Sequence, residues 1–198
     1  MNAVLKDDRI SAEDCLQGEL ISETKHEYID GYVYAMAGTS INHGRIASNL
    51  VGELRQHLKN LPCDVLTADV KINVNACKFF YPDVVVICNH DNGTDYYTEN
   101  PILIVEVLSD STQRKDRTLK RLAYQSLPSL QEYVLVEQDF VDVEVSRRSA
   151  NWDCHHYFWG DDVHFESVGL TLPITEIYRR VDNEELRELL QASTTATD

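Results

Sequence analysis

Two short apolar runs, each interrupted by one acidic residue, constrain the fold of this chain most strongly. The first follows Pro82 and reads PDVVVIC, and the second begins at Pro101 and reads PILIVEVLS. Runs this short and this rich in Val and Ile are typical of strands covered on both faces of a sheet. Asp83 opens the first run and Glu106 lies inside the second. A buried carboxylate is costly unless its charge is compensated, so two of them on successive strands predict a bound divalent cation.

The periodicity of the apolar residues predicts an α/β protein. A mixed β-sheet flanked by helices carries additional antiparallel strands toward the C-terminus. One domain fits the length of 198 residues, and we place it at residues 10–180, followed by a short C-terminal helix and a frayed tail at 181–198. The expected helices span 11–20, 43–60, 111–126 and 183–191. The expected strands span 27–29, 32–34, 65–74, 79–88, 102–108, 131–136, 141–145, 152–159 and 163–168.

The composition predicts a cytoplasmic protein that does not contact a membrane. No apolar run approaches the roughly 18 residues that a membrane span requires, and the first residues lack the apolar core of a signal peptide. The five cysteines are odd in number and none are spaced as CxxC, which indicates reduced thiols in a reducing compartment.

The net charge of −15 opposes binding to nucleic acid, because an acidic surface repels phosphates. Positive charge is concentrated in the window QRKDRTLKR, from Gln113 to Arg121, where five residues are basic and one is acidic. In isolation this window is best explained as the exposed face of a helix. If it lies beside the acidic strands, it offers a route of approach for a nucleic acid.

Asp83, Glu106 and the backbone carbonyl of Val107 together offer the oxygen ligands that Mg²⁺ prefers. Mg²⁺ is usually bound by one or two carboxylates and keeps several waters. Such an ion polarises a phosphoryl group and supplies a nucleophilic water. The sequence therefore predicts a metal-dependent hydrolase with a site at these strands.

The helix after Glu106 adds further candidates. Asp116, Lys120 and Tyr124 are spaced i, i+4 and i+8 and share one face, and Lys120 on that face could orient the attacking water or stabilise developing charge. On spacing alone, an exposed Asp–Lys pair worth about 0.3–0.5 kcal/mol explains the pattern better. Glu27 is a weaker candidate for a metal or water ligand, and His43 for a phosphate contact at a helix N-terminus. A turn-flanking acid and a capping residue explain these two better on spacing alone.

Four segments together resemble the Uma-type family of predicted endonucleases, which belongs to the restriction-endonuclease-like PD-(D/E)xK superfamily. They read KHEYIDGYVYAMAGTSINH, PDVVVIC, PILIVEVLSDSTQRKDRTLKRLAYQ and LQEYVLVE. The resemblance implies a restriction-endonuclease-like core and Mg²⁺- or Mn²⁺-dependent cleavage of phosphodiester bonds. Asp83 matches the motif aspartate, Glu106 the motif acid and Glu27 an N-terminal acid of the site. Leu108 stands where the superfamily has its lysine, and the resemblance implies that Lys120 replaces it.

We therefore expect a metal-dependent endonuclease that acts on DNA, with a homodimer as a plausible assembly for this fold. The predicted substrate contacts are His43, Arg114, Lys115, Arg117 and Tyr124. Two alternatives remain open. One is a non-catalytic nuclease-like module that binds nucleic acid or a protein, and the other is a metal-dependent phosphohydrolase of small molecules.

Overall fold

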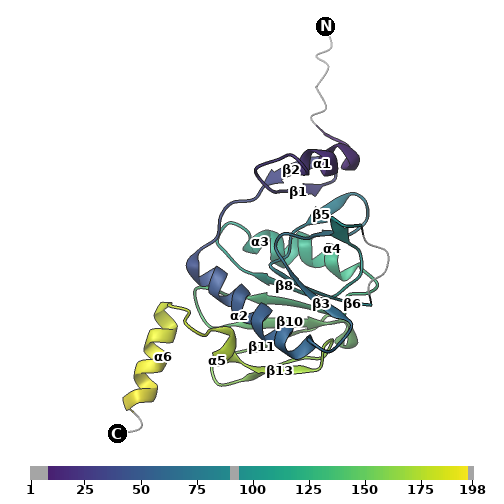
Figure 1. The fold of residues 1–198 in the computed structure, drawn as a ribbon. Helices are drawn as coiled ribbons and strands as arrows, with labels where there is room; N and C mark the ends of the chain where they lie inside the picture. The colour runs from purple at the N-terminus through teal and green to yellow at the C-terminus, as the bar shows by residue number, and fades with distance from the viewer. Residues whose placement is uncertain (1–8, 90–93, 196–198) are drawn as a thin grey trace.

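The computed structural model describes residues 9–89 and 94–195 (Figure 1). Its largest sheet is mixed, because strands β8 and β9 run parallel and the other neighbours run antiparallel. This confirms the predicted α/β class and the mixed sheet. In sheet order, its strands are β11 (Cys154–Tyr157), β10 (Val143–Arg147), β9 (Glu132–Val136), β8 (Pro101–Val107), β6 (Val84–Cys88) and β3 (Cys63–Thr67).

A second sheet was not expected from the sequence. Two predicted strands, 65–74 and 79–88, are each divided between the two sheets. Turns at residues 68–70 and at Tyr81–Asp83, where proline interrupts the ladder, separate the two halves. In order, the second sheet contains β2 (Tyr32–Ala35), β1 (His26–Ile29), β5 (Lys78–Phe80), β4 (Lys71–Asn73) and β7 (Tyr97–Thr98), and a separate hairpin pairs β12 (Asp162–Phe165) with β13 (Leu170–Pro173).

Helices cover both faces of the large sheet, as predicted. The long helix α2 (Ile41–Leu58) begins at Ser40, whose hydroxyl accepts from the His43 amide. The connection between β8 and β9 is helical from Gln113 to Gln125 and contains α3 (Gln113–Lys115), a π-helical turn (Asp116–Lys120) and α4 (Arg121–Gln125). The remaining helices are α1 (Ala12–Glu19), a 3₁₀ turn (Arg148–Ala150), α5 (Ile174–Ile177) and α6 (Glu184–Thr195). Within the described ranges, none of them has the length and apolar character needed to cross a bilayer.

Two apolar clusters fill the space on either side of the large sheet. One lies under α2 and α5 and includes Leu50, Val84 and Val105. It also contains Leu186 of α6, so this helix packs on the domain at its first turn. The other cluster includes Ile104 of β8 and Tyr124 of α4. It joins the large sheet to α4 and to the second sheet, which Figure 1 shows beyond α3 and α4.

Cys63 and Cys88 form a disulfide, so the prediction of five reduced thiols is wrong for this pair. The two residues are directly opposed on β3 and β6, with their Cα atoms 4.0 Å apart. Antiparallel neighbours bring cysteine side chains this close whatever their sequence spacing, which here is 25 residues. The cysteines therefore no longer support the predicted cytoplasmic location, and Cys15, Cys77 and Cys154 remain as free thiols.

Candidate active site

The structure brings Asp83 and Glu106 together on one face of the large sheet. Val84 pairs with Val105 in the antiparallel β6–β8 ladder, and the same register sets Asp83 opposite Glu106. Directly opposed residues of antiparallel strands project from the same face. The Val107 amide donates to Asp83 Oδ2 at 2.7 Å, which fixes this carboxylate at the end of the ladder.

Glu106 lies in a buried polar pocket and is bound by two side chains of the following helix. Lys120 Nζ donates to Glu106 Oε1 at 3.0 Å, and the Tyr124 hydroxyl donates to the same oxygen at 3.0 Å. Burial raises the pKa of Glu106 well above its usual range. Lys120 opposes this shift, while the negative charges of Asp116, Asp83 and Glu27 reinforce it. Burial and the three neighbouring acids therefore outweigh the single ammonium in setting the pKa of Glu106.

Lys120 is the centre of this pocket. Its ammonium lies 2.9 Å from Glu27 Oε1 and 3.1 Å from Asp116 Oδ1, in addition to Glu106. Burial lowers the pKa of Lys120, but the three carboxylates outweigh it and raise that pKa well above its usual value. Lys120 is therefore a charged ammonium and not a general base. Because its side chain is only 5% exposed, the explanation as an exposed Asp–Lys pair is wrong.

A π-helical turn places the amine and its partners. Asp116 and Lys120 are its first and last residues, and both side chains are buried. The Tyr133 hydroxyl on β9 donates to the Asp116 carbonyl at 3.0 Å, which ties this wide turn to the sheet. Burial raises the pKa of Asp116 against the effect of Lys120. Such turns are frequent at functional sites, and the apolar periodicity of the sequence carried no sign of this one.

Glu27 and His43 approach the acids from two further elements. Glu27 on β1 binds Lys115 Nζ at 2.8 Å through Oε2, while its Oε1 faces Lys120. His43, in the first turn of α2, has its Nε2 3.2 Å from Asp83 Oδ2. Both residues are buried, so neither is the exposed turn acid or simple capping residue that spacing favoured. The structure thus gathers Glu27, Glu106 and Lys120 in one ion-pair cluster and places Asp83 beside it across the β6–β8 ladder.

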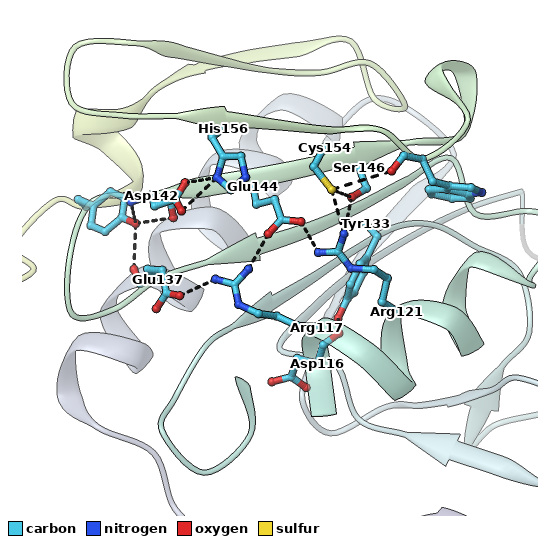
Figure 2. A network of polar contacts seen from close by, with 12 residues as sticks. Asp116, Arg117, Arg121, Tyr133, Glu137, Asp142, Glu144, Ser146, Cys154 and His156 are labelled. Atoms are coloured by element: carbon cyan, nitrogen blue, oxygen red, sulfur yellow. Dashed lines mark hydrogen bonds and ion pairs between the residues drawn. The ribbon is translucent and has the colours of Figure 1, made fainter. Parts of the chain in front are cut away.

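The basic window does not form an exposed cationic face. Arg117 binds Glu137 and Glu144, each at 2.6 Å, and Arg121 also binds Glu144 (Figure 2). Lys115 and Lys120 bind the acids of the pocket. Among the five basic residues of the window, Arg114 is the exposed one. Most of this positive charge therefore docks the helix on the sheet.

Tyr124 does not fit its predicted contact with substrate. Its side chain is fully buried, and its hydroxyl is occupied by Glu106. The pKa of Tyr124 lies well above its usual value because of its burial and the nearby charge of Glu106. It is therefore a neutral donor that positions Glu106.

Glu137 and Glu144 are structural partners that sequence reasoning missed. Glu144 on β10 accepts from both Arg117 and Arg121, and Figure 2 shows it between the two guanidinium groups. Burial raises the pKa of Glu144, but hydrogen bonds and charge from these arginines outweigh that effect and lower it overall. Five basic residues close together in a chain of net charge −15 indicated that acidic residues elsewhere in the chain would form buried ion pairs with them.

A cleft of about 450 Å³ opens beside Asp83. It runs along α2, from His43 to Arg55, beside the turn that connects β3 to β4. His43 and Asp83 line its inner end, and Lys25 and Asp69, which form an ion pair with each other, line its mouth. A substrate in this cleft would meet Asp83 before the more deeply buried Glu106.

The pocket fits a divalent cation by its charge and its acceptors. Glu27, Glu106 and Asp116 contact the ammonium groups of Lys115 and Lys120, and a fourth carboxyl group, on Asp83, contacts His43 and the Val107 amide. Glu27 Oε1 and Asp116 Oδ1 are buried without a well-directed hydrogen bond, although Lys120 lies close to both. Across residues 9–89 and 94–195, no three His, Cys, Asp or Glu side chains form a ready-made ligand cluster. Asp83 and Glu106, which the β6–β8 register sets opposite each other, are the two candidate ligands, and Lys120 also contacts Glu106.

Comparison with known proteins agrees with this architecture. Residues 12–174 match the family Uma2, described as "Putative restriction endonuclease". An uncharacterised protein of Synechocystis sp., slr1290, is 36% identical over 175 residues, covering 86% of this chain and 92% of the relative. Another from the same organism, sll1609, is 34% identical over 139 residues, covering 68% and 78%.

A solved structure has the same fold. It is the crystal structure of a protein from Anabaena variabilis described as a putative nuclease belonging to DUF820. It superposes with a TM-score of 0.71 at 18% identity, covering 85% of this chain and 97% of the other. The family match spans most of the chain and includes both acidic strands and the helix with Lys120. The chain therefore belongs to the Uma2 family and has a restriction-endonuclease-like fold.

Proposed function

We propose that this protein is a metal-dependent endonuclease that hydrolyses phosphodiester bonds, with DNA as its substrate. The observation that carries the proposal is the pairing of Asp83 with Glu106 on one face of the sheet, next to a cleft. Two carboxylates on directly opposed residues of neighbouring strands are a suitable ligand set for Mg²⁺ or Mn²⁺. The family match supports a nuclease, and the cluster of acids around Glu106 supports a bound cation.

Asp83, Glu106 and the Val107 carbonyl would hold the cation. When bound, Mg²⁺ or Mn²⁺ polarises the phosphodiester and makes a water nucleophilic at neutral pH. The protein supplies the orientation of the acids. The Val107 amide and His43 hold Asp83, and Lys120 and Tyr124 hold Glu106. Lys120 also keeps positive charge where negative charge develops during phosphoryl transfer.

A supercoiled-plasmid nicking assay with Mg²⁺ or Mn²⁺ tests the proposal. We expect the wild type to convert supercoiled DNA to nicked circles, and Asp83→Asn to be at least about 100-fold slower because a ligand is lost. Asp162→Asn, at an exposed position on β12, is the matched control and should cut at the wild-type rate. Equal cutting by all three proteins would remove Asp83 from the site.

Calorimetric titration separates catalysis from the alternatives. Wild-type protein should release or absorb heat on binding Mn²⁺, and Asp83→Asn should not. Metal binding without cutting of any nucleic acid would redirect the proposal to small phosphoesters, which a screen of nucleotides and sugar phosphates would detect. A protein that neither binds the metal nor cuts would be a non-catalytic member of the family.

A further inference from the structure

Two half-exposed tyrosines stand at the rim of the candidate active site. Tyr32 and Tyr34 lie on β2, an edge strand of the second sheet, and are 50% and 45% exposed. They are two residues apart, so both rings project from one face of the strand. Their partners on β1 are Ile29 and Glu27, which face the buried pocket. The two rings are therefore on the same side of this sheet as the acids.

Tyr34 is linked to the pocket through one cation. Lys115 Nζ lies 5.0 Å from the centre of the Tyr34 ring and 2.8 Å from Glu27 Oε2. Glu27 in turn contacts Lys120. Along the chain, the segment after Tyr34 leads through Thr39 to His43, and these two residues line the cleft beside Asp83. Tyr34 is thus connected to the acids through Lys115 and Glu27, and to the cleft through the segment that follows it in the chain.

The pairing of many basic side chains with acids of the protein favours stacking of bases on these two rings over binding of phosphates. Binding to duplex DNA depends mainly on lysine and arginine side chains that neutralise phosphates. At least nine of the 18 Lys and Arg residues here form ion pairs with the protein's own acids: Lys25, Lys78, Lys115, Arg117, Lys120, Arg121, Arg147, Arg179 and Arg187. Stacking on an aromatic ring requires no such charge and tolerates any base. It does require that the base be unpaired.

We propose that Tyr34, with Tyr32 next to it, is a stacking surface for unpaired bases, and that the substrate is single-stranded DNA or an unpaired segment of DNA. This inference rests on the proposed phosphodiester hydrolysis and specifies its substrate. The bases stack on the rings of β2 while the backbone passes Lys115 toward the cleft at Asp83. A duplex keeps its bases stacked on one another and gains nothing from these rings.

Fluorescence anisotropy with a labelled single-stranded oligonucleotide tests this surface. Binding is measured in Ca²⁺ and again in EDTA, so that the readout does not depend on cleavage. The wild type should bind the single strand more tightly than a duplex of equal length. Tyr34→Ala should weaken single-strand binding about tenfold or more, and Tyr34→Phe should retain it, because the ring and not the hydroxyl is used. The loss should be the same at low and high salt.

Tyr96→Ala is the matched control, since Tyr96 is 59% exposed and precedes β7 at the opposite edge of the same sheet. It should bind like the wild type. Equal affinities of wild type and Tyr34→Ala, a preference for duplex, or no binding of either form by the wild type would each overturn the stacking surface. A dimer in sedimentation that Tyr34→Ala dissolves would overturn it too, because β2 would then pair with a second copy.

The two proposals fail in distinguishable ways. If nicking requires Asp83 but binding of the single-stranded oligonucleotide does not require Tyr34, the nuclease proposal survives and the stacking surface does not. If Tyr34 governs single-strand binding but Asp83→Asn cuts like the wild type, the stacking surface survives and the assigned hydrolytic site does not.

Discussion

At the scale of single residues, Lys120 decides how this pocket is held together. An ammonium buried with three carboxylates is stable only because each partner compensates for the water that another has lost. Removing it would leave Glu27, Glu106 and Asp116 buried without their common counter-ion. The lysine is thus a structural requirement of the site, whatever it contributes to hydrolysis.

Lys120→Met should therefore destabilise the protein by roughly 3–5 kcal/mol, the cost of leaving buried charges unpaired. Thermal or urea unfolding followed by circular dichroism measures this. Lys59→Met, on an exposed lysine just after α2, is the control and should change stability by less than about 0.5 kcal/mol. Similar losses in the two variants would mean that the carboxylates do not depend on the buried ammonium.

Tyr124→Phe should slow hydrolysis more than it destabilises the fold. The change removes the hydrogen bond to Glu106 but keeps the ring packed in the core, so the expected loss of stability is about 1 kcal/mol. The turnover rate should fall while the Michaelis constant stays near the wild-type value, because the buried side chain does not contact substrate. Tyr178→Phe serves as the control, because it removes buried hydrogen bonds of the Tyr178 hydroxyl with the Glu137 carbonyl and with the backbone of Asp142. The free energy of unfolding of this variant should fall at least as much as that of Tyr124→Phe, and its turnover rate should stay at the wild-type value.

At the scale of elements, the helical segment from Gln113 to Gln125 is fixed to the sheet by ion pairs. Arg117 and Arg121 reach across to Glu144 on β10, which is buried although the alternating sequence VDVEV predicts a strand with one wet face. The alternation does mark a polar face. What it cannot show is that a helix covers this face with arginines in place of water.

The Glu144 pair predicts a pH-dependent stability. The pKa of Glu144 is lowered in the folded state, so its contribution is present above the unfolded value of about 4.3 and is lost as the pH falls through the folded value. Glu144→Gln should cost roughly 3 kcal/mol at pH 7, and its difference from wild type should shrink below about pH 4. Glu188→Gln, at an exposed position on α6, is the control. A difference that persists unchanged at about pH 3 would contradict the ion-pair assignment.

The elements show which parts of the site the sequence could predict. Asp83 and Glu106 stood out because an acid inside an apolar strand is costly, and antiparallel pairing then set them side by side. The shared face of Asp116, Lys120 and Tyr124 was also visible as i, i+4 spacing. The inward direction of the Arg117 side chain was not visible in the sequence, because it depends on acids that are distant in sequence. The π-helical turn likewise reflects tertiary contacts that no periodicity records.

At the scale of the whole molecule, the pocket lies where the large sheet, the helical connection and the second sheet meet. The mixed sheet and its flanking helices followed from the apolar runs. The second sheet could not be predicted in this way. Apolar residues continue before and after the turns inside 65–74 and 79–88, so each run looks like one unbroken strand. Glu27 joins the pocket only through that second sheet, so the family resemblance could suggest its place whereas spacing could not.

The completed fold should not need its cation. EDTA should leave the melting temperature unchanged, because Glu27, Glu106 and Asp116 already form ion pairs with Lys115 and Lys120 in the absence of a metal. Added Mn²⁺ should raise the melting temperature, because mass action adds about 2.7 kcal/mol to the free energy of unfolding at a concentration roughly 100 times the dissociation constant. Asp83→Asn should show no such rise. Unfolding on chelation would instead mark the ion as part of the scaffold.

The position of Lys120 therefore sets an order of assembly. A newly made chain carries its own positive charge into the interior and can finish folding in a cell depleted of divalent ions. Under the proposed function, a metal would bind last, to a framework already in place, and could leave again without unfolding the polypeptide.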